Sequence, residues 1–445
     1  IKYVFNESNR IAEMNTKAGD KLIFTYDPQR GNLIKVTNTS GESMSFSYAN
    51  DLITKLTLPN GHEINYTYDS KGRLISKSES VSDYEISTES FSAGIAQTQS
   101  YGYNTGGRIN KITTPSGTAS TATVNISYTD DGKLSSVLLP ENMSLSFEYL
   151  AKDVLGNTGA RVSLKTGTTV FAETSSVLNQ SGAAVRKTSS DGTVYNITRD
   201  EDQNITQTSF ENTFYKVNEN GSVTSEKRNV SYSYAYNANG DIQSVTDPEG
   251  NVTSYAYQDE NNPHSITSVS FPKGENETGT VTSTYDASTG NLLTETDPVG
   301  GVTSYGYGRT DENGEVKDKF LLTSVTDRYG TQTSYNYTSD LRISSQSLRN
   351  SASELITERV ISYDASGNPE VLKDAKGSYV KYVYDEKNRV VSAIDLGSTL
   401  IAEGKPRAYV SYYPSGEVKR HTDANGNYVN YTYDALNRVV SEKVN

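Results

Sequence analysis

The sequence predicts an all-β protein built from tandem β-hairpins, and three observations support this fold class. A Tyr-Asp pair recurs inside the frame aromatic-x-Tyr-Asp-x-x-Gly/Asn-Arg/Asn-apolar, at intervals of about 20–22 residues. Each interval contains two turn signals, and the segments between them alternate with period two and are rich in Tyr, Thr and β-branched residues. No stretch combines a helical period with capping residues. This pattern is typical of one small unit stacked many times.

The frame is kept best at three places, of which Tyr66-Thr-Tyr68-Asp69-Ser-Lys-Gly72-Arg73-Leu74 is the first. We call the residue before the Asp or Asn of the frame the anchor. Anchors fall at Phe5, Tyr26, Tyr48, Tyr68, Tyr103, Tyr128, Tyr149, Tyr236, Tyr257, Tyr285, Tyr307, Tyr337, Tyr363, Tyr384, Tyr413 and Tyr433. The residues to which we assign a structural role in the repeat are Tyr26, Asp27, Tyr68, Asp69, Arg73, Tyr285, Asp286, Tyr363, Asp364, Tyr384, Asp385, Arg389, Tyr433, Asp434 and Arg438.

The frame is degenerate between about 150 and 235, but it keeps its spacing there. Arg199 takes the anchor position before Asp200, and Leu178-Asn179 and Val217-Asn218 lie near the expected offsets. Counting through this stretch gives about nineteen units without a break. We therefore predict a single array, and a single domain, over 1–445.

Two turns punctuate each unit. The anchor turn follows the anchor, as in Asp69-Ser-Lys-Gly72, and the return turn comes about ten residues later, as in Asp247-Pro-Glu-Gly250 or Pro59-Asn60-Gly61. Asp at the first position and Gly at the last predict a type I turn closed by a residue in the left-handed region. The segments between these turns are the predicted strands.

Extra polar residues enter some units and predict longer, protruding hairpin tips. They lie near 79–99, 150–177, 258–282, 308–322, 346–360 and 394–410. Two strands in each of about nineteen units make about 38 strands, and an open twisted sheet of that width must curl. The prediction is a curled or spiral antiparallel sheet, part of a hollow β-shell.

Composition excludes several classes of function. The net charge is −13 without a block of Lys or Arg, which argues against binding to nucleic acid or to anionic membrane surfaces. The chain has no cysteine, so disulfides, thiol catalysis and thiolate zinc sites are excluded. No apolar run approaches the length that crosses a membrane. The chain begins inside a repeat, so we expect it to be a piece of a longer precursor.

The paired tyrosines, such as Tyr66 with Tyr68 and Tyr305 with Tyr307, share a strand face. They suit a platform on which sugars stack, or a ladder in which tyrosines of neighbouring units pack ring on ring. Regular recurrence favours the ladder, because a binding site is a local exception. The frame arginines, found for example at 73 and 389, are expected to stack on a tyrosine of the next unit or to pair with the frame Asp.

The turn acids are expected to accept hydrogen bonds from their own turns rather than to bind calcium. Asp200-Glu-Asp202 comes nearest to a calcium loop and lacks its spacing. His62, His264 and His421 flank Gly or Pro turns in different units, so exposure is expected. No nucleophile, base and orienting group come together in the sequence. The sequence thus predicts no enzyme, no cofactor and no metal.

The frame closely resembles the YD repeat of the Rhs (rearrangement hotspot) superfamily, over essentially the whole chain. That superfamily includes bacterial polymorphic toxins, wall-associated proteins of Gram-positive bacteria, insecticidal toxin-complex shell subunits and animal teneurins. The Asn- and Ser-rich composition is most similar to the wall-associated type. The resemblance implies a hollow β-shell that wraps around a C-terminal toxin domain until delivery to a neighbouring cell. The Asp-Pro-x-Gly-Leu-like self-cleavage motif of the Rhs core has no counterpart, because Asp247-Pro248 and Asp297-Pro298 lie in ordinary repeat turns.

The function expected from this resemblance is structural. The chain would be a shell segment of a secreted, cell-wall or cell-surface toxin-delivery protein used in contact-dependent competition. Its partners would be the C-terminal toxin domain and the remaining shell of the parent chain, and it would otherwise be a monomer. The alternative is a cell-surface adhesin that binds a carbohydrate or a receptor through the inserted tips.

Overall fold

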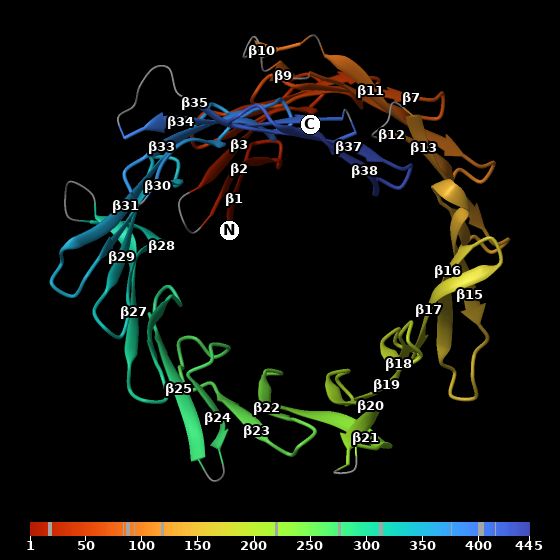
Figure 1. Ribbon diagram of the computed structural model, residues 1–445, viewed down its shortest axis with the longest axis vertical. Coiled ribbons are helices and arrows are strands. Elements are labelled where there is room, and N and C mark those ends of the chain that lie inside the picture. Colours follow the sequence, from red (N-terminus) through yellow and green to blue (C-terminus); the bar gives the residue numbers. More distant parts are fainter. Residues whose placement is uncertain are drawn as a thin grey trace. The chain divides into compact units, whose positions relative to one another are not determined.

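A computed structural model of the chain (Figure 1) describes most of the sequence. The described residues are 1–16, 20–82, 84–85, 90–92, 94–116, 120–218, 221–274, 277–310, 315–374, 376–398, 405–413 and 415–445. Within them lie 38 β-strands and one short 3-10 helix, η1 (Pro140–Asn142). Of these strands, 36 form one antiparallel sheet, while β9 (Tyr84–Glu85) and β10 (Ser90–Phe91) form a second. The all-β prediction is confirmed. No helix in the described part has the length and apolar character that a membrane span requires.

The chain divides into two compact units. Unit 1 comprises Ile1–Val124 and Tyr305–Asn445, and unit 2 comprises Asn125–Ser304. Within each unit, successive strands of the large sheet pair antiparallel, as in the hairpin of β7 (Glu63–Tyr68) and β8 (Leu74–Val81). The organisation as a single array of about nineteen units remains a prediction from the sequence.

The strands of the N-terminal part of unit 1 are β1 (Lys2–Phe5), β2 (Ile11–Asn15), β3 (Lys21–Tyr26), β4 (Leu33–Asn38), β5 (Ser43–Ala49), β6 (Leu52–Thr57), β7, β8, β9, β10, β11 (Ile95–Tyr103) and β12 (Ile109–Ser116). Those of its C-terminal part are β28 (Val316–Thr326), β29 (Gln332–Tyr337), β30 (Ile343–Arg349), β31 (Leu355–Tyr363), β32 (Pro369–Lys373), β33 (Tyr379–Tyr384), β34 (Val390–Gly397), β35 (Lys405–Tyr412), β36 (Val418–Asp423), β37 (Tyr428–Tyr433) and β38 (Val439–Val444).

The strands of unit 2 are β14 (Leu134–Leu138), β15 (Met143–Leu150), β16 (Thr158–Thr166), β17 (Thr169–Leu178), β18 (Ala184–Thr188), β19 (Val194–Arg199), β20 (Ile205–Val217), β21 (Val223–Tyr236), β22 (Ile242–Thr246), β23 (Val252–Ala256), β24 (Ser268–Gly274), β25 (Glu277–Tyr285) and β26 (Leu292–Thr296). Two further strands, β13 (Ser120–Tyr128) and β27 (Val302–Thr310), each run across a boundary between the units.

The predicted turns are present and have the predicted geometry. In the anchor turn after Tyr68, the Asp69 N–H donates to the Arg73 carbonyl (2.9 Å) and the Gly72 N–H donates to the Asp69 carbonyl (3.0 Å). Gly72 lies at φ +76°, the left-handed conformation that glycine adopts without strain. The register shifts by one residue between Thr67 and Tyr68, so the turn ends in a β-bulge at the anchor. Because neighbouring strands run in opposite directions, the anchor turns lie at one end of the strands and the return turns lie at the other end.

In several repeats one face of the strand is more covered than the other. In β7, Ile64, Tyr66 and Tyr68 are half-buried, whereas Glu63, Asn65 and Thr67 between them are exposed. The same alternation in β5 places Met44, Phe46 and Tyr48 on the covered face. This arrangement fits strands with one packed and one wet face, as Tyr-rich and Thr-rich segments predict.

Five of the expected insertions lie between paired strands. The stretch near 346–360 is the turn region between β30 and β31, and the stretch near 79–99 lies between β8 and β11, which pair with each other, and contains β9 and β10. The stretches near 258–282, 308–322 and 394–410 involve β24 and β25, β27 and β28, and β34 and β35. Parts of the insertions, at 83, 86–89, 93, 275–276, 311–314 and 399–404, fall outside the described residues.

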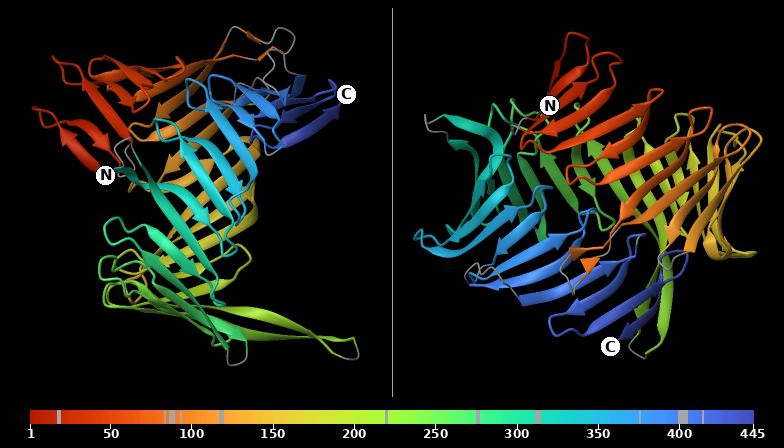
Figure 2. Two further views of the ribbon diagram at one scale, coloured as in Figure 1. Left: turned by 90° about the vertical axis from the view of Figure 1, so that its left-hand side faces the viewer. Right: turned by 90° about the horizontal axis from the view of Figure 1, so that it is seen from above.

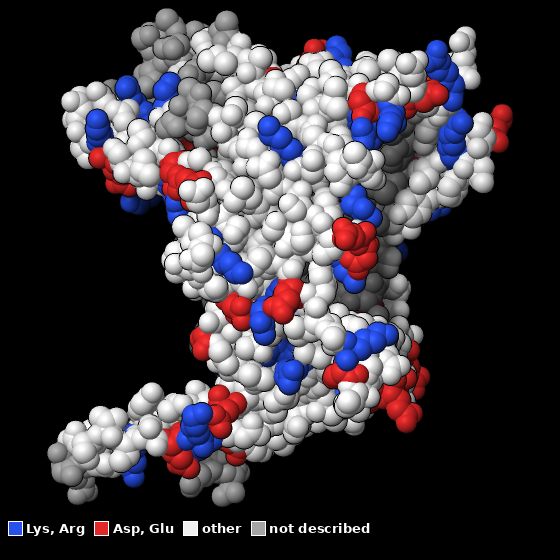
Figure 3. Space-filling model, turned by 90° about the vertical axis from the view of Figure 1, so that its right-hand side faces the viewer, with Lys and Arg blue, Asp and Glu red and all other residues white. Residues whose placement is uncertain are grey.

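The longest hairpin, β20–β21, was not among the expected insertions. Strand β19 pairs with β20 only as far as Ser209, and β22 pairs with β21 only from Ser233, so the hairpin extends beyond its neighbours within unit 2 (Figure 2). Tyr215 on this extension is 74% exposed. Acidic and basic side chains lie side by side along it (Figure 3), as in the Lys227–Glu211 ion pair (2.6 Å). The extension therefore buries little of its own surface.

Shortening this hairpin is expected to leave the fold intact. Replacing residues 211–229 by Asn-Gly would keep the opposed pair Phe210 and Val230 and close it with a two-residue turn. Exposed ion pairs contribute little, so the free energy of unfolding should change by no more than about 1 kcal/mol. Urea unfolding followed by circular dichroism measures this change. A loss of several kcal/mol would mean that the extension supports the sheet.

Candidate functional site: the repeat motif and the seam in unit 1

The anchor tyrosine joins each repeat to the one before it through its hydroxyl. The Tyr68 hydroxyl donates to the Ile53 carbonyl (2.7 Å), a backbone group at the start of the strand that follows the previous anchor turn. Tyr433 donates in the same way to Val418 (2.9 Å). The same kind of bond is made by Tyr26, Tyr48, Tyr103, Tyr236, Tyr257, Tyr285, Tyr337, Tyr363, Tyr384 and Tyr412. The recurring tyrosine thus has a structural task.

This bond differs from the ring-on-ring ladder that the sequence suggested. Two tyrosine rings do meet edge to face at Tyr413 and Tyr433, with centroids 6.0 Å apart. In the repeats described above, however, the link is a hydrogen bond to the backbone. The tyrosine hydroxyl donates to a backbone carbonyl of the preceding repeat, at the β-bulge where the strand ladder is interrupted. Burial raises the pKa of the Tyr384 hydroxyl, and the nearby Asp364 carboxylate raises it further.

Removing one anchor hydroxyl is expected to weaken the sheet measurably. The substitution Tyr68→Phe leaves the Ile53 carbonyl without its partner and should lower the free energy of unfolding by about 1 kcal/mol. Tyr215→Phe is the matched control, because Tyr215 is 74% exposed on the long hairpin. Urea unfolding of the two variants beside the parent chain gives the difference. Equal effects of the two substitutions would contradict a structural task for the anchor hydroxyl.

The frame Asp and Arg close the anchor turn and connect it to the next repeat. The Asp385 carboxylate accepts the N–H groups of Lys387 and Arg389, both at 2.9 Å, and pairs with the Arg389 guanidinium at 2.6 Å. The guanidinium carbon of Arg389 lies 4.2 Å from the ring centroid of Tyr412 in the following repeat. Both expected roles of the frame Arg, pairing with the Asp and stacking on a tyrosine, are therefore combined in one side chain.

The other frame residues behave alike. Arg73 pairs with Asp69 (2.7 Å) and lies 4.5 Å from the Tyr103 ring, and Arg438 pairs with Asp434 (2.6 Å). Asp27 and Asp364 accept N–H groups of their own turns, as the turn pattern predicted. Hydrogen bonds from the Ser288 hydroxyl and from the Thr289 N–H and hydroxyl lower the pKa of Asp286 to about 2.

One predicted anchor is wrong by one residue, and another carries an arginine in place of tyrosine. At the Tyr412-Tyr413 pair, the hydroxyl of Tyr412 makes the anchor bond to Val390 (2.8 Å), while the Tyr413 N–H donates to Glu417 in the turn. Tyr412 is therefore the anchor, and Tyr413 takes the position of the frame Asp. In the degenerate stretch, Arg199 donates through Nε to the Ala184 carbonyl (3.1 Å), 15 residues earlier. Its guanidinium replaces the tyrosine hydroxyl, so the predicted register is confirmed there.

The three histidines lie on different elements, and one of them departs from expectation. His62 is buried, and its Nε2 lies 2.9 Å from a Glu79 oxygen. His264 is exposed and faces the Asp241 carboxylate (3.0 Å), and His421 is exposed on β36. Asp200, the nearest approach to a calcium loop, accepts the N–H of Asn204 within its own turn (2.8 Å). The burial of His62 has its cause in a contact between distant repeats.

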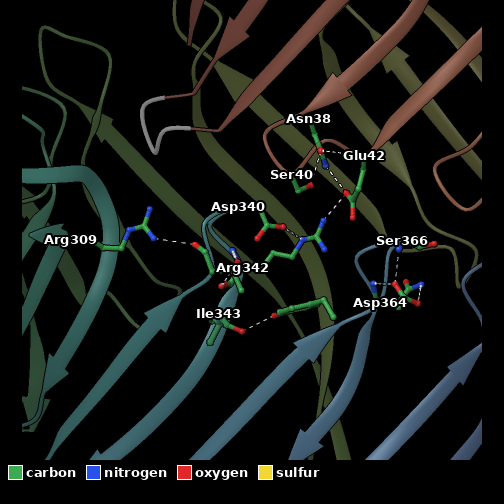
Figure 4. A network of polar contacts seen from close by, with 12 residues as sticks. Asn38, Ser40, Glu42, Arg309, Asp340, Arg342, Ile343, Asp364 and Ser366 are labelled. Atoms are coloured by element: carbon green, nitrogen blue, oxygen red, sulfur yellow. Dashed lines mark hydrogen bonds and ion pairs between the residues drawn. The ribbon is translucent and has the colours of Figure 1, made fainter. Parts of the chain in front are cut away.

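That contact is a seam between the two chain segments of unit 1. We call the seam the set of contacts between the first 124 residues and the residues from 305 onward. At one point of the seam, Arg342 and Glu42 form an ion pair at 2.7 Å (Figure 4). Asp340 also holds the Arg342 guanidinium (3.1 Å), and Asn38 donates to Glu42 (2.6 Å). Repeats about 300 residues apart thus touch, which a flat ribbon would prevent.

A second point of the seam is centred on two adjacent residues of the Asp385 anchor turn. The Glu386 carbonyl accepts the side-chain amide of Asn60 (2.8 Å), and its carboxylate accepts the Ser82 N–H. Lys387 reaches the Glu79 carboxylate (3.1 Å), which also holds His62. The residues form a chain of polar contacts that passes from one segment of unit 1 to the other.

Two carboxylates of the seam, those of Glu79 and Glu42, have lowered pKa values. Burial alone would raise the pKa of Glu79, but the hydrogen bond from His62 and the ammonium groups of Lys387 and Lys77 outweigh it and leave the pKa lowered. Burial likewise opposes ionisation of Glu42, and the bonds from Arg342 and Asn38 prevail, so that pKa is lowered too. Both ion pairs therefore persist well into mildly acidic solution.

Apolar packing and a cavity complete the seam. The Tyr84 side chain, from the insertion near 79–99, packs against Val391 and Tyr409 of the C-terminal segment. A cavity of about 610 Å³ lies beside it, lined from both segments by residues that include Asn60, His62, Phe91, Asp364, Asn368, Tyr384, Glu386 and Asn388. Glu42 and Glu386 hold variable positions of their turns and Glu79 lies in an inserted stretch, so no repeat signal in the sequence could identify them. Arg342 holds the Arg position of the frame, but its ion pair with a distant repeat could not be predicted from the repeat.

The geometry of the repeat has a counterpart among known families. The model for the teneurin YD-shell matches residues 21–159, and the model for the RHS repeat matches residues 236–275 and 412–444. These matches include the anchors Tyr26, Tyr48, Tyr68, Tyr103, Tyr236, Tyr257, Tyr412 and Tyr433, whose hydroxyl bonds are described above. The chain belongs to the Rhs/YD-repeat superfamily. A comparison with curated proteins finds no significant match.

Solved structures share the fold of this YD-repeat chain. The crystal structure of TcdB2-TccC3-Cdc42 is 13% identical, with a TM-score of 0.50, and the match covers 100% of this chain and 28% of that one. The crystal structure of TcdB2-TccC3 without hypervariable C-terminal region gives the same identity and TM-score, with 27% of that chain covered. The Photorhabdus luminescens Tc holotoxin pore is 12% identical, with a TM-score of 0.37, and the match covers 98% of this chain and 30% of that one. The chain thus spans less than a third of the first two structures it matches.

Proposed function

We propose that this chain is a section of the wall of a β-shell that encloses a toxin polypeptide. The wall would belong to a larger bacterial toxin-delivery protein, secreted or held at the cell wall or surface, and used against neighbouring cells on contact. The partners of the section would be the toxin domain and the rest of the shell. Membership of the Rhs/YD-repeat superfamily supports this proposal, and so do the extended sheet and its small buried core.

The observation that carries the proposal is the seam in unit 1. An enclosing wall needs contacts between repeats that are distant in the sequence, and within unit 1 the Arg342–Glu42 and Lys387–Glu79 ion pairs join repeats about 300 residues apart. The mechanism would be passive: strand pairing and anchor bonds hold the wall, and the seam holds its edges. The repeat residues supply architecture throughout, and the enclosed polypeptide supplies the chemistry.

Limited proteolysis of the full-length parent protein tests enclosure. The C-terminal domain should resist a protease within the parent and be digested rapidly when it is produced alone. The matched control is a flexible tag on the outside of the parent, which the protease should remove at the same rate throughout. If the domain is cut equally fast in both forms, the wall does not enclose it and the proposal is wrong.

A further inference from the structure

We propose that the turn bearing Glu386 and Lys387 is a latch, and that the wall opens along the seam when this latch is released. The inference deepens the proposed function, because it names the place at which an enclosing wall would part. All contacts of the latch are made between residues of this chain. It combines a rigid turn, three polar contacts on two adjacent residues, and an apolar plug beside them.

Rigidity of the turn comes from the repeat motif. The Asp385 side chain is 1% exposed and binds two turn N–H groups and the Arg389 guanidinium. Arg389 is in turn stacked on Tyr412 at 4.2 Å, and the Tyr384 hydroxyl is bonded to the Pro369 carbonyl at 2.7 Å. The two residues that follow Asp385 are therefore presented to the other segment in a fixed orientation.

The receiving side is equally well ordered. The return turn closed by the Leu58 and His62 backbones presents Asn60, whose side-chain oxygen accepts the His62 N–H (3.0 Å) while its amide donates to Glu386. The Glu79 carboxylate contacts the His62 ring on its own segment and forms the ion pair with Lys387 of the other segment. The side chains of Glu79 and Lys387 are 17% and 23% exposed, so solvent screens their attraction only in part.

The seam is weaker than the sheet on either side of it. Strands β33 and β34 are joined by six register pairs, Tyr379↔Gly397 to Tyr384↔Val390, with backbone hydrogen bonds between them. At the seam, side chains provide the contacts: an ion pair at Glu42, the latch, and the Tyr84 plug against Val391 and Tyr409. Opening the seam breaks these contacts and leaves every strand pair intact, so it is the opening that costs the least.

Hydrogen exchange measured by mass spectrometry on the full chain tests the latch. In the double variant Glu386→Ala/Lys387→Ala, the Ser82 amide, which lies outside the strand pairs and is read in peptide 77–82, should exchange about tenfold faster or more, since charge-assisted hydrogen bonds of this kind change an opening equilibrium by at least that factor. Peptides in β15–β17 should be unchanged. The matched control is Ser70→Ala/Lys71→Ala, at the same two positions of the exposed Asp69 turn, which should leave exchange at 77–82 as in the parent.

The single variant Lys387→Gln separates the latch from the stability of the turn. It keeps the length of the side chain and removes its charge from Glu79, and it should still raise exchange at 77–82 severalfold. Unchanged exchange at 77–82 in both variants, or an equal rise over the whole sheet in Lys387→Gln, would overturn the proposal. The proteolysis of the parent decides enclosure independently: a local rise in exchange with no protection of the C-terminal domain would leave the latch standing and refute the enclosing wall.

Discussion

Replacing Asp385 by alanine is expected to lower the free energy of unfolding by about 3–5 kcal/mol, the usual loss when one partner of a buried ion pair is removed. The Asp385 carboxylate is 1% exposed and holds two backbone N–H groups and Arg389, whose side chain is 19% exposed. Without the carboxylate, the guanidinium stays confined against Tyr412 with its charge uncompensated. Urea unfolding followed by circular dichroism measures the loss.

The matched control is Asp434→Ala, in the same frame of another repeat. Asp434 makes the same contacts to its turn and to Arg438, but the Arg438 side chain is 58% exposed and can be hydrated once its partner is gone. The loss should therefore be clearly smaller. If both substitutions cost the same, the burial of Asp385 against the rest of unit 1 contributes nothing, and the turn alone accounts for the effect.

The sequence predicts the local part of this fold well, because the determinants of a repeat are short-range. The Asp-x-x-Gly pattern specifies a turn whose N–H groups the Asp accepts, and a strict period places each anchor tyrosine beside the strand before it. The substitution of Arg199 for tyrosine in the degenerate stretch could be predicted from spacing alone, and its bond to Ala184 confirms it.

Features that depend on contacts between distant repeats could not be predicted in the same way. The sequence predicts His62 to be an exposed turn residue, but it is buried because its return turn touches the Asp385 turn. Which distant turn it meets depends on the curvature of the sheet, and the repeat does not encode this. The choice between Tyr412 and Tyr413 as anchor depends on the position of one bulge. The length of the β20–β21 hairpin escaped prediction because Asn218 forms the same turn at a protruding tip as in a repeat.

The seam is expected to open in acid, and the sign follows from its carboxylates. The pKa of Glu79 and that of Glu42 are lowered below their usual value of 4.5 in the folded chain. A lowered pKa means that ionised carboxylates stabilise the seam fully above about pH 4.5, and that this stabilisation is lost as the pH falls through the folded values. The groups facing Glu79 are His62, Lys77 and Lys387, and those facing Glu42 are Arg342, with Asp340 beside it, and Asn38.

Hydrogen exchange at 77–82, corrected for the intrinsic rate at each pH, should therefore be slow and constant from pH 7 to 5 and should rise below about pH 4.5. In Glu79→Gln the neutral amide cannot titrate, so the seam should already exchange faster at pH 7 and should depend less on acid. Glu63→Gln is the matched control, because Glu63 pairs with Lys55 on its own segment and is 49% exposed. If Glu79→Gln and Glu63→Gln both keep the full response to acid, the groups that titrate lie outside the latch, because Glu79 is the carboxylate that Lys387 of the latch binds.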